Sequence, residues 1–200
     1  MNEKSIVFLP GTAGQAAPWR KLSADGYVIG KGELASDFVG TASGEWVVVV
    51  PAEDIAVRWL VLPQGNTAQQ VTAARWQMAE QLGHDLVDDE VVVGRKGPDG
   101  ATPVAVVRRS LVSAWRSWAE DAGLNVVSVV PAQLCVPFDE GRLHAVPSLS
   151  GNIILSAKGL SVSAEPDLAN DLIGDQQVDW TPADQALDVL AVGAISSPLN

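Results

Sequence analysis

The chain has 200 residues, of which 47% are hydrophobic and 18% are charged, so it can bury a core and lacks the composition of a disordered chain. Its formal net charge of −11 argues against nucleic-acid binding and against direct docking on anionic lipid, because both require a basic face. The one cysteine, Cys135, excludes an internal disulfide and is typical of a reducing compartment.

The first elements are predicted to be short antiparallel strands. Ser5–Leu9 is an apolar strand, and Trp19–Leu22 and Tyr27–Lys31 can pair across the turn-rich residues between them. The segment from Gly11 to Gly14 lacks the Gly-Lys-Ser/Thr ending of a phosphate loop, so the sequence predicts an ordinary loop there.

The central stretch predicts two strands and one long helix. Trp46–Val50 is apolar throughout, as in a strand buried on both faces. Ala56–Leu62 is rich in β-formers and ends before a proline. Asn66 or Thr67 can cap a helix that continues without Gly or Pro until Gly83.

The next region predicts a hairpin, a second helix and another strand. Val91–Arg95 and Thr102–Arg108 flank a Pro-Asp-Gly turn. Ser110 is predicted to cap a helix that ends at Gly123, followed by a buried strand over Val126–Val130. Short connections on both sides of this helix predict a right-handed parallel crossover. The apolar face of the helix is formed by Leu111, Ala114, Trp115, Trp118 and Ala122.

The C-terminal quarter predicts three strands and two short helices. The strands are Arg142–Pro147, Asn152–Ala157 and Leu160–Ala164, and the helices are Asp167–Ile173 and Pro182–Val192. We therefore divide the chain into an N-terminal α/β lobe or pair of lobes over residues 1–138 and a smaller β/α lobe over 139–200. Pattern alone predicts an α/β fold with mixed sheets.

Catalytic motifs are missing from the sequence. His84 and His144 are the only histidines, and neither has a metal-ligand spacing. The nucleophile elbow, the Cys-x-x-Cys pair and the dinucleotide-binding glycine pattern are also absent. The residues themselves predict no catalytic site, no cofactor and no metal.

An acidic segment follows the long helix. Its carboxylates could bind a divalent cation, form a plain solvated turn, or attract a basic partner, because clustered charge speeds and orients association. The spacing differs from that of an EF-hand loop. The acids in question are Glu80, Asp85, Asp88, Asp89 and Glu90.

Trp76 lies off the apolar stripe of the same helix. It projects roughly 140° from Val71, the first residue of that stripe, at 100° per residue. A tryptophan exposed beside carboxylates is a typical anchor for a protein partner, although packing under a loop is an equal alternative. The predicted partner-binding residues are Trp76, Glu80, Asp85, Asp88, Asp89 and Glu90.

Several short motifs in a fixed order resemble a known family. They are Pro51-Ala52-Glu53-Asp54, Leu62-Pro63, Ala79-Glu80-Gln81-Leu82, the acidic run from Asp85 to Glu90, Pro103–Val107 and Val129–Phe138. Over roughly Trp46 to Phe138 this order resembles type II secretion system protein L.

The resemblance implies actin-like, ribonuclease-H-like lobes without nucleotide-binding motifs, since the first strand carries no acid. It also implies a non-enzymatic adaptor that binds the N-terminal domain of the secretion ATPase and recruits it to an inner-membrane platform containing the M, C and F proteins. A homodimer at the cytoplasmic face of the bacterial inner membrane is expected, with a single membrane span beyond residue 200. The alternative is an actin-like ATP-binding protein similar to the type IV pilus assembly protein M.

Overall fold

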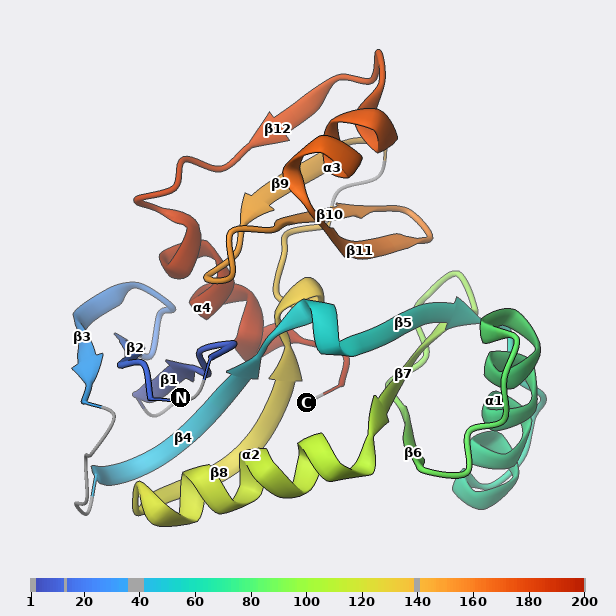
Figure 1. The fold of residues 1–200 in the computed structure, drawn as a ribbon, viewed down its shortest axis with the longest axis horizontal. Coiled ribbons are helices and arrows are strands. Elements are labelled where there is room, and N and C mark those ends of the chain that lie inside the picture. The colour runs from blue at the N-terminus through green and yellow to red at the C-terminus, as the bar shows by residue number, and fades with distance from the viewer. Residues whose placement is uncertain (1–2, 13, 36–41, 139–140, 200) are drawn as a thin grey trace.

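A computed structural model describes residues 3–12, 14–35, 42–138 and 141–199. The chain forms three sheets (Figure 1), which we call the central, inserted and terminal sheets. The central sheet has the strand order β3-β2-β1-β4-β8. Its strands are β1 (Lys4–Phe8), β2 (Ala17–Leu22), β3 (Val28–Leu34), β4 (Ala42–Val50) and β8 (Leu124–Pro131).

The terminal sheet repeats the topology of the central one. In the central sheet β1, β2 and β3 form an antiparallel meander, and β4 returns parallel to β1. In the terminal sheet β9, β10 and β11 form the same meander, and β12 returns parallel to β9. The strands are β9 (Leu143–Pro147), β10 (Ile153–Ala157), β11 (Leu160–Ala164) and β12 (Val178–Trp180), with α3 (Pro166–Ile173) before β12. The amino-acid sequence shows no matching repeat.

The inserted sheet lies between β4 and β8 in the chain. It has the order β5-β7-β6, and both of its pairings are antiparallel. A short 3-10 turn, η1 (Ala52–Asp54), leads into it, and α2 (Arg109–Asp121) returns the chain to β8. Its elements are β5 (Ile55–Leu60), α1 (Thr67–Leu82), β6 (Asp89–Val93) and β7 (Thr102–Arg108).

The predicted crossover around the second helix is wrong. β7 and β8 belong to different sheets, and the parallel partner of β8 is β4. β7 pairs instead with β6, its neighbour in sequence, because an antiparallel pair needs only a short connection. On its other side it pairs with β5, also antiparallel, across the intervening α1 and β6. The strand predicted over Val126–Val130 is confirmed as part of β8, but it is not buried on both faces, since Val127 and Val129 on this sheet edge are 48% and 45% exposed.

Two helix starts also differ from the predictions. The cap of α2 is Arg108, which makes no side-chain cap hydrogen bond, and Ser110 lies inside the first turn. On this helix Ala114 is exposed, and Ala119 takes the expected place in the core. The last helix, α4, spans Ala186–Ser196. It begins later than the predicted start at Pro182, because residues 183–185 form a turn.

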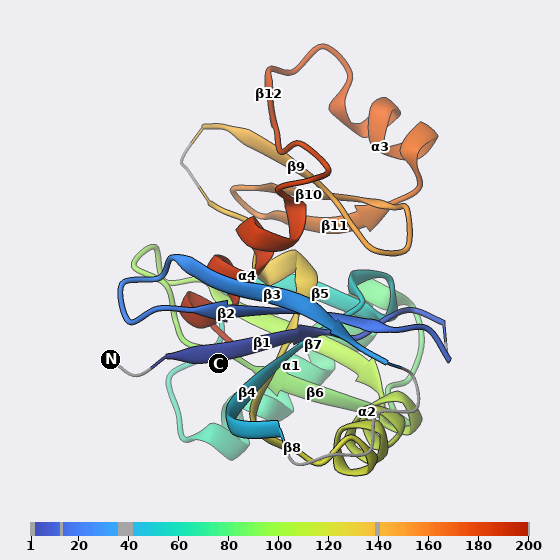
Figure 2. The same cartoon turned by 90° about the vertical axis from the view of Figure 1, so that its left-hand side faces the viewer.

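Helix α4 packs between the central sheet and the terminal sheet, whose shared topology makes them two duplicated units (Figure 2). Its buried residues Leu190 and Ala194 share a core with β1, β4, β9 and β10. At Gly193 an added Cβ would lie 1.7 Å from the carbonyl oxygen of Cys135, so only glycine permits this approach.

The predicted lobe boundary after residue 138 stays a prediction, because residues 139 and 140 lie outside the described residues. The last helix of the predicted C-terminal lobe nevertheless packs on the central sheet.

Gln133 ties the three sheets together. It lies in the 3-10 turn η2 (Ala132–Leu134) after β8 and is 2% exposed. Its Nε2 donates to the carbonyl oxygens of Ala52, at 3.3 Å, and Ile55, at 2.9 Å, where the central sheet passes into the inserted one. The backbone carbonyl oxygen of Gln133 accepts a hydrogen bond of 3.0 Å from Ser161 Oγ on the terminal sheet.

Replacing Gln133 with leucine is expected to lower the free energy of unfolding by about 2 kcal/mol, because it leaves two buried carbonyl groups without their donor. Chemical denaturation of the variant and the wild type measures this loss. Gln176→Leu, at an exposed position beyond α3, is the matched control and should be neutral. Equal midpoints for Gln133→Leu and wild type would contradict the proposed role of the amide.

Candidate functional site

The helix α1 carries its own start and stop signals. The Asn66 side chain accepts from the backbone N–H of Gln69, and the Gln69 side chain accepts from the backbone N–H of Asn66, both at 3.0 Å. This reciprocal capping box satisfies two of the free donors at the helix start. Gly83 ends the helix with φ 73°, a left-handed conformation that suits glycine. The predicted bounds of the helix are confirmed.

One face of α1 packs on the inserted sheet, and the opposite face is exposed to solvent. Ala74 and Met78 are fully buried in a small core with Val91, Val104 and Leu60. Trp76 is 75% exposed, as its helical position predicts. Figure 1 places α1 at one end of the longest axis of the molecule, away from the central and terminal sheets. The ring of Trp76 therefore lies on a projecting part of the surface.

Arg75 holds the acidic segment against α1. Its Nη1 donates to the carbonyl oxygen of Leu86, and its Nη2 donates to the carbonyl oxygen of Asp89 at 3.2 Å. Leu86 anchors the same segment in the core at 3% exposure. The Asp89 carboxylate lies 4.0 Å from Nε2 of His84, which follows the helix end. The turn after α1 is thus fixed to the helix by a residue that the sequence analysis did not single out.

The structure brings most of the predicted site residues to one region but separates Glu90 from them. Glu80, Asp85 and Asp88 are exposed on or just after α1, and Asp89 is partly covered. Glu90 points to the other face of the inserted sheet, because Val91, its neighbour on β6, packs on α1 and side chains alternate along a strand. Among the described residues, no three or more His, Cys, Asp or Glu side chains gather in a way that could hold a metal ion.

An Arg75→Met variant is expected to release the acidic turn, because the two carbonyl groups lose a charged donor. Hydrogen exchange of residues 85–89 should quicken about tenfold or more, in line with charged hydrogen bonds worth about 1.5–3 kcal/mol. Arg116→Met, on the exposed face of α2, should leave that exchange unchanged. Unaltered exchange in Arg75→Met would show that Leu86 and the bonds from Arg109 to Val87 and Asp88 hold the turn without Arg75.

One cavity between the central and terminal sheets is very small. The cavity between the end of β1 and the β9–β10 turn measures about 30 Å³, which is room for about one water molecule. Phe8, Leu149, Leu187 and Leu190 are among the side chains that line it. Nucleotide-binding members of an actin-like fold hold Mg²⁺ and ATP between such units with acids and glycine-rich turns. This cavity is too small for a nucleotide, and β1 carries no acid.

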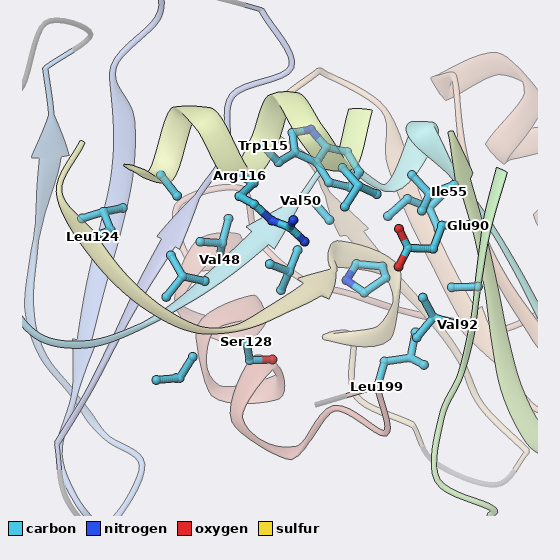
Figure 3. Close-up of a pocket in the computed structure, with 18 of the residues that line it drawn as sticks. Val48, Val50, Ile55, Glu90, Val92, Trp115, Arg116, Leu124, Ser128 and Leu199 are labelled. Atoms are coloured by element: carbon cyan, nitrogen blue, oxygen red, sulfur yellow. The ribbon is translucent and has the colours of Figure 1, made fainter. Parts of the chain in front are cut away.

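A larger groove of about 630 Å³ runs between α2, β8 and the inserted sheet (Figure 3); we call it the α2–β8 groove. Val48 and Val50 of β4 lie at its base, and Trp115 projects into it from α2. Arg116 on α2 and Glu90 on β6 enter it from two different walls. It is mostly apolar and is far larger than the cavity of about 30 Å³ beside the end of β1.

The family model for protein L of the type II secretion system matches residues 6–187. The chain belongs to this family. The resemblance seen in the motifs is therefore confirmed over nearly the whole chain. Protein L of Dickeya chrysanthemi is 28% identical over 129 residues, and protein L of Klebsiella pneumoniae is 26% identical over 137 residues. These stretches cover 64% and 68% of this chain but 32% of each relative, so the chain spans about a third of the length of these proteins.

Solved structures confirm the predicted fold class. The cytoplasmic domain of EpsL, an inner-membrane component of the type II secretion system of Vibrio cholerae, matches with a TM-score of 0.77 at 18% identity, over 99% of this chain and 97% of that one. A Bacteroides thetaiotaomicron protein with an actin-like ATPase fold matches at 0.52 and 9% identity, over 96% and 95% of the two chains. A chain of the PilM–PilN type IV pilus biogenesis complex matches at 0.56 and 13%, over 96% and 68%. No helix in the described part of the chain is long and apolar enough to cross a membrane.

Proposed function

We propose that this chain is a non-enzymatic adaptor of the type II secretion system, which docks the secretion ATPase onto the inner-membrane platform. The observation that carries this proposal is the projecting face of α1, where Trp76 is 75% exposed beside acids that Arg75 holds in place. An exposed tryptophan next to fixed charges suits a protein contact, because the ring supplies buried area and the charges orient the partner.

The contact comprises Trp76, Glu80, Asp85 and Asp88, and its partner is the N-terminal domain of the ATPase. Asp89 supports the contact from behind, since its backbone carbonyl is bound by Arg75. Glu90 lies on the opposite face of the inserted sheet and is not part of this surface. A net charge of −11 favours a basic partner face.

The further partners follow from the family and are part of the same proposal. The M, C and F proteins of the platform are the expected neighbours, and the chain acts as a homodimer at the cytoplasmic face of the inner membrane. The connection through Gln133 supports this role, since a docking module that transmits force between an ATPase and a membrane platform needs a stiff body.

Removal of the Trp76 ring is expected to weaken binding to the isolated N-terminal domain of the ATPase about thirtyfold, the effect of losing a central anchor worth about 2 kcal/mol. Isothermal titration calorimetry of Trp76→Ala measures it. Trp180→Ala is the matched control, because Trp180 is also exposed, at 52%, but lies on β12. A charge reversal, Asp85→Lys with Asp88→Lys, should weaken binding further at low salt.

Absence of binding by the wild-type chain would overturn the adaptor function itself. Binding that is equal for wild type, Trp76→Ala and the charge-reversed variant would overturn only the assigned surface, and the ATPase would then dock elsewhere on the chain.

The alternative function, an ATP-binding assembly protein similar to the pilus protein M, makes a different prediction. The cavity of about 30 Å³ between the units is far below the roughly 300–1,000 Å³ of ligand pockets. We therefore expect no saturable binding of a fluorescent ATP analogue with Mg²⁺ at concentrations up to about 1 mM. Saturable binding at micromolar concentration, competed by unlabelled ATP, would favour the alternative.

A further inference from the structure

The β8 wall of the α2–β8 groove is an open sheet edge. β8 stands last in the order of the central sheet, and its partner on the inner side is β4. In the described part of the chain no strand pairs with its outer side. The backbone N–H and C=O groups along that side are therefore available to pair with another strand.

β8 also lacks the charges that two other edge strands, β3 and β6, carry. Its sequence, Leu-Asn-Val-Val-Ser-Val-Val-Pro, has no charged residue. β3, at the opposite edge of the same sheet, carries Lys31 and Glu33, and β6, an edge of the inserted sheet, begins with Asp89 and Glu90. Charged edge strands resist unwanted pairing, and an apolar edge left open invites a partner strand.

The side chains of β8 add an apolar contact to the open backbone. Val127 and Val129 are 48% and 45% exposed and both line the groove. The β4–β8 ladder shifts register beside Val127 and is then regular, with Val129 opposite Val48. Val129 thus stands next to the base of the groove, where an added strand would cover it.

The charges at the groove walls indicate which partner fits. Two acids, Glu90 and Glu120, and one base, Arg116, line the groove and are all exposed. The remaining lining is largely apolar, including Val112, Trp115 and Leu199. An occupant with apolar residues at alternate positions and an excess of positive charge complements these walls.

We propose that the α2–β8 groove binds an extended apolar segment of a partner protein, which pairs with β8 as a sixth strand of the central sheet and carries a basic residue toward Glu90 and Glu120. This mode of recognition uses main-chain hydrogen bonds for affinity and alternate side chains for specificity. The groove lies on the face of the inserted sheet opposite α1, so the proposal does not rest on the proposed ATPase contact.

The probe that tests it is a fluorescein-labelled synthetic peptide of eight residues, matched to the eight residues of β8. It has valine at every second position, threonine between, and lysine at one end. Fluorescence anisotropy should show saturable micromolar binding to the chain, and hydrogen exchange of the 124–131 amides should slow in the complex. The same peptide with N-methylated backbone amides cannot pair as a strand and should not bind.

Val129→Lys is expected to weaken peptide binding about tenfold or more, because it places a charge on the apolar edge. Ile29→Lys is the matched control, because Ile29 is 54% exposed on β3, at the other edge of the same sheet. The affinity of this variant for the peptide should stay within about twofold of wild type. Circular dichroism of both variants establishes that they fold.

Three results would overturn the proposal. They are the absence of saturable binding, equal binding of the N-methylated peptide, and equal affinity of Val129→Lys and wild type. If analytical ultracentrifugation shows instead a dimer that Val129→Lys dissociates and that the peptide does not displace, the edge pairs with a second copy of this chain, and the partner segment is excluded.

Discussion

The arrangement of the three sheets depends on one buried amide, that of Gln133. Its side chain bonds to the backbone at the junction of the central and inserted sheets, while its backbone accepts from Ser161 on the terminal sheet. The side chain has 2% exposure, and its Nε2 uses two backbone acceptors, which offsets part of the cost of burying the amide. Its Oε1 has no hydrogen-bond partner within the described part of the chain. An apolar side chain of similar volume would fill the space but would leave the carbonyl groups of Ala52 and Ile55 without this donor.

The contacts of Gln133 with all three sheets suit the proposed docking role. In a nucleotide-binding protein of this architecture the space between the units is where the ligand lies. Here α4 packs between the units, with Gly193 against the backbone of Cys135 and Asp188 paired with Arg20 of β2. Burial raises the pKa of the Cys135 thiol, so this cysteine stays protonated inside the packed region. The proposed contact on α1 and the α2–β8 groove lie on opposite faces of the inserted sheet.

Local sequence signals predicted individual elements well. The cap signal at Asn66 or Thr67 and the stop at Gly83 predicted the bounds of α1, and the 3.6-residue period placed Met78 on the core stripe and Trp76 off it. These signals act within a turn or two of helix and need no knowledge of the rest of the chain. Strand partners were harder. A run such as Val126–Val130 looks the same at the centre and at the edge of a sheet until its neighbours are known.

The sequence by itself determined most of the elements, the family, the mixed α/β class and the position of Trp76 off the apolar stripe of α1. Only the tertiary structure decided that β7 joins β5 and β6, that β8 is an open edge, that Glu90 faces away from α1, and that Arg75 holds the acidic turn. The physical reason is the range of the forces involved. Caps, turns and helical periodicity are contacts between near neighbours, whereas sheet membership and the packing of α4 between the units arise from contacts between residues far apart in the chain.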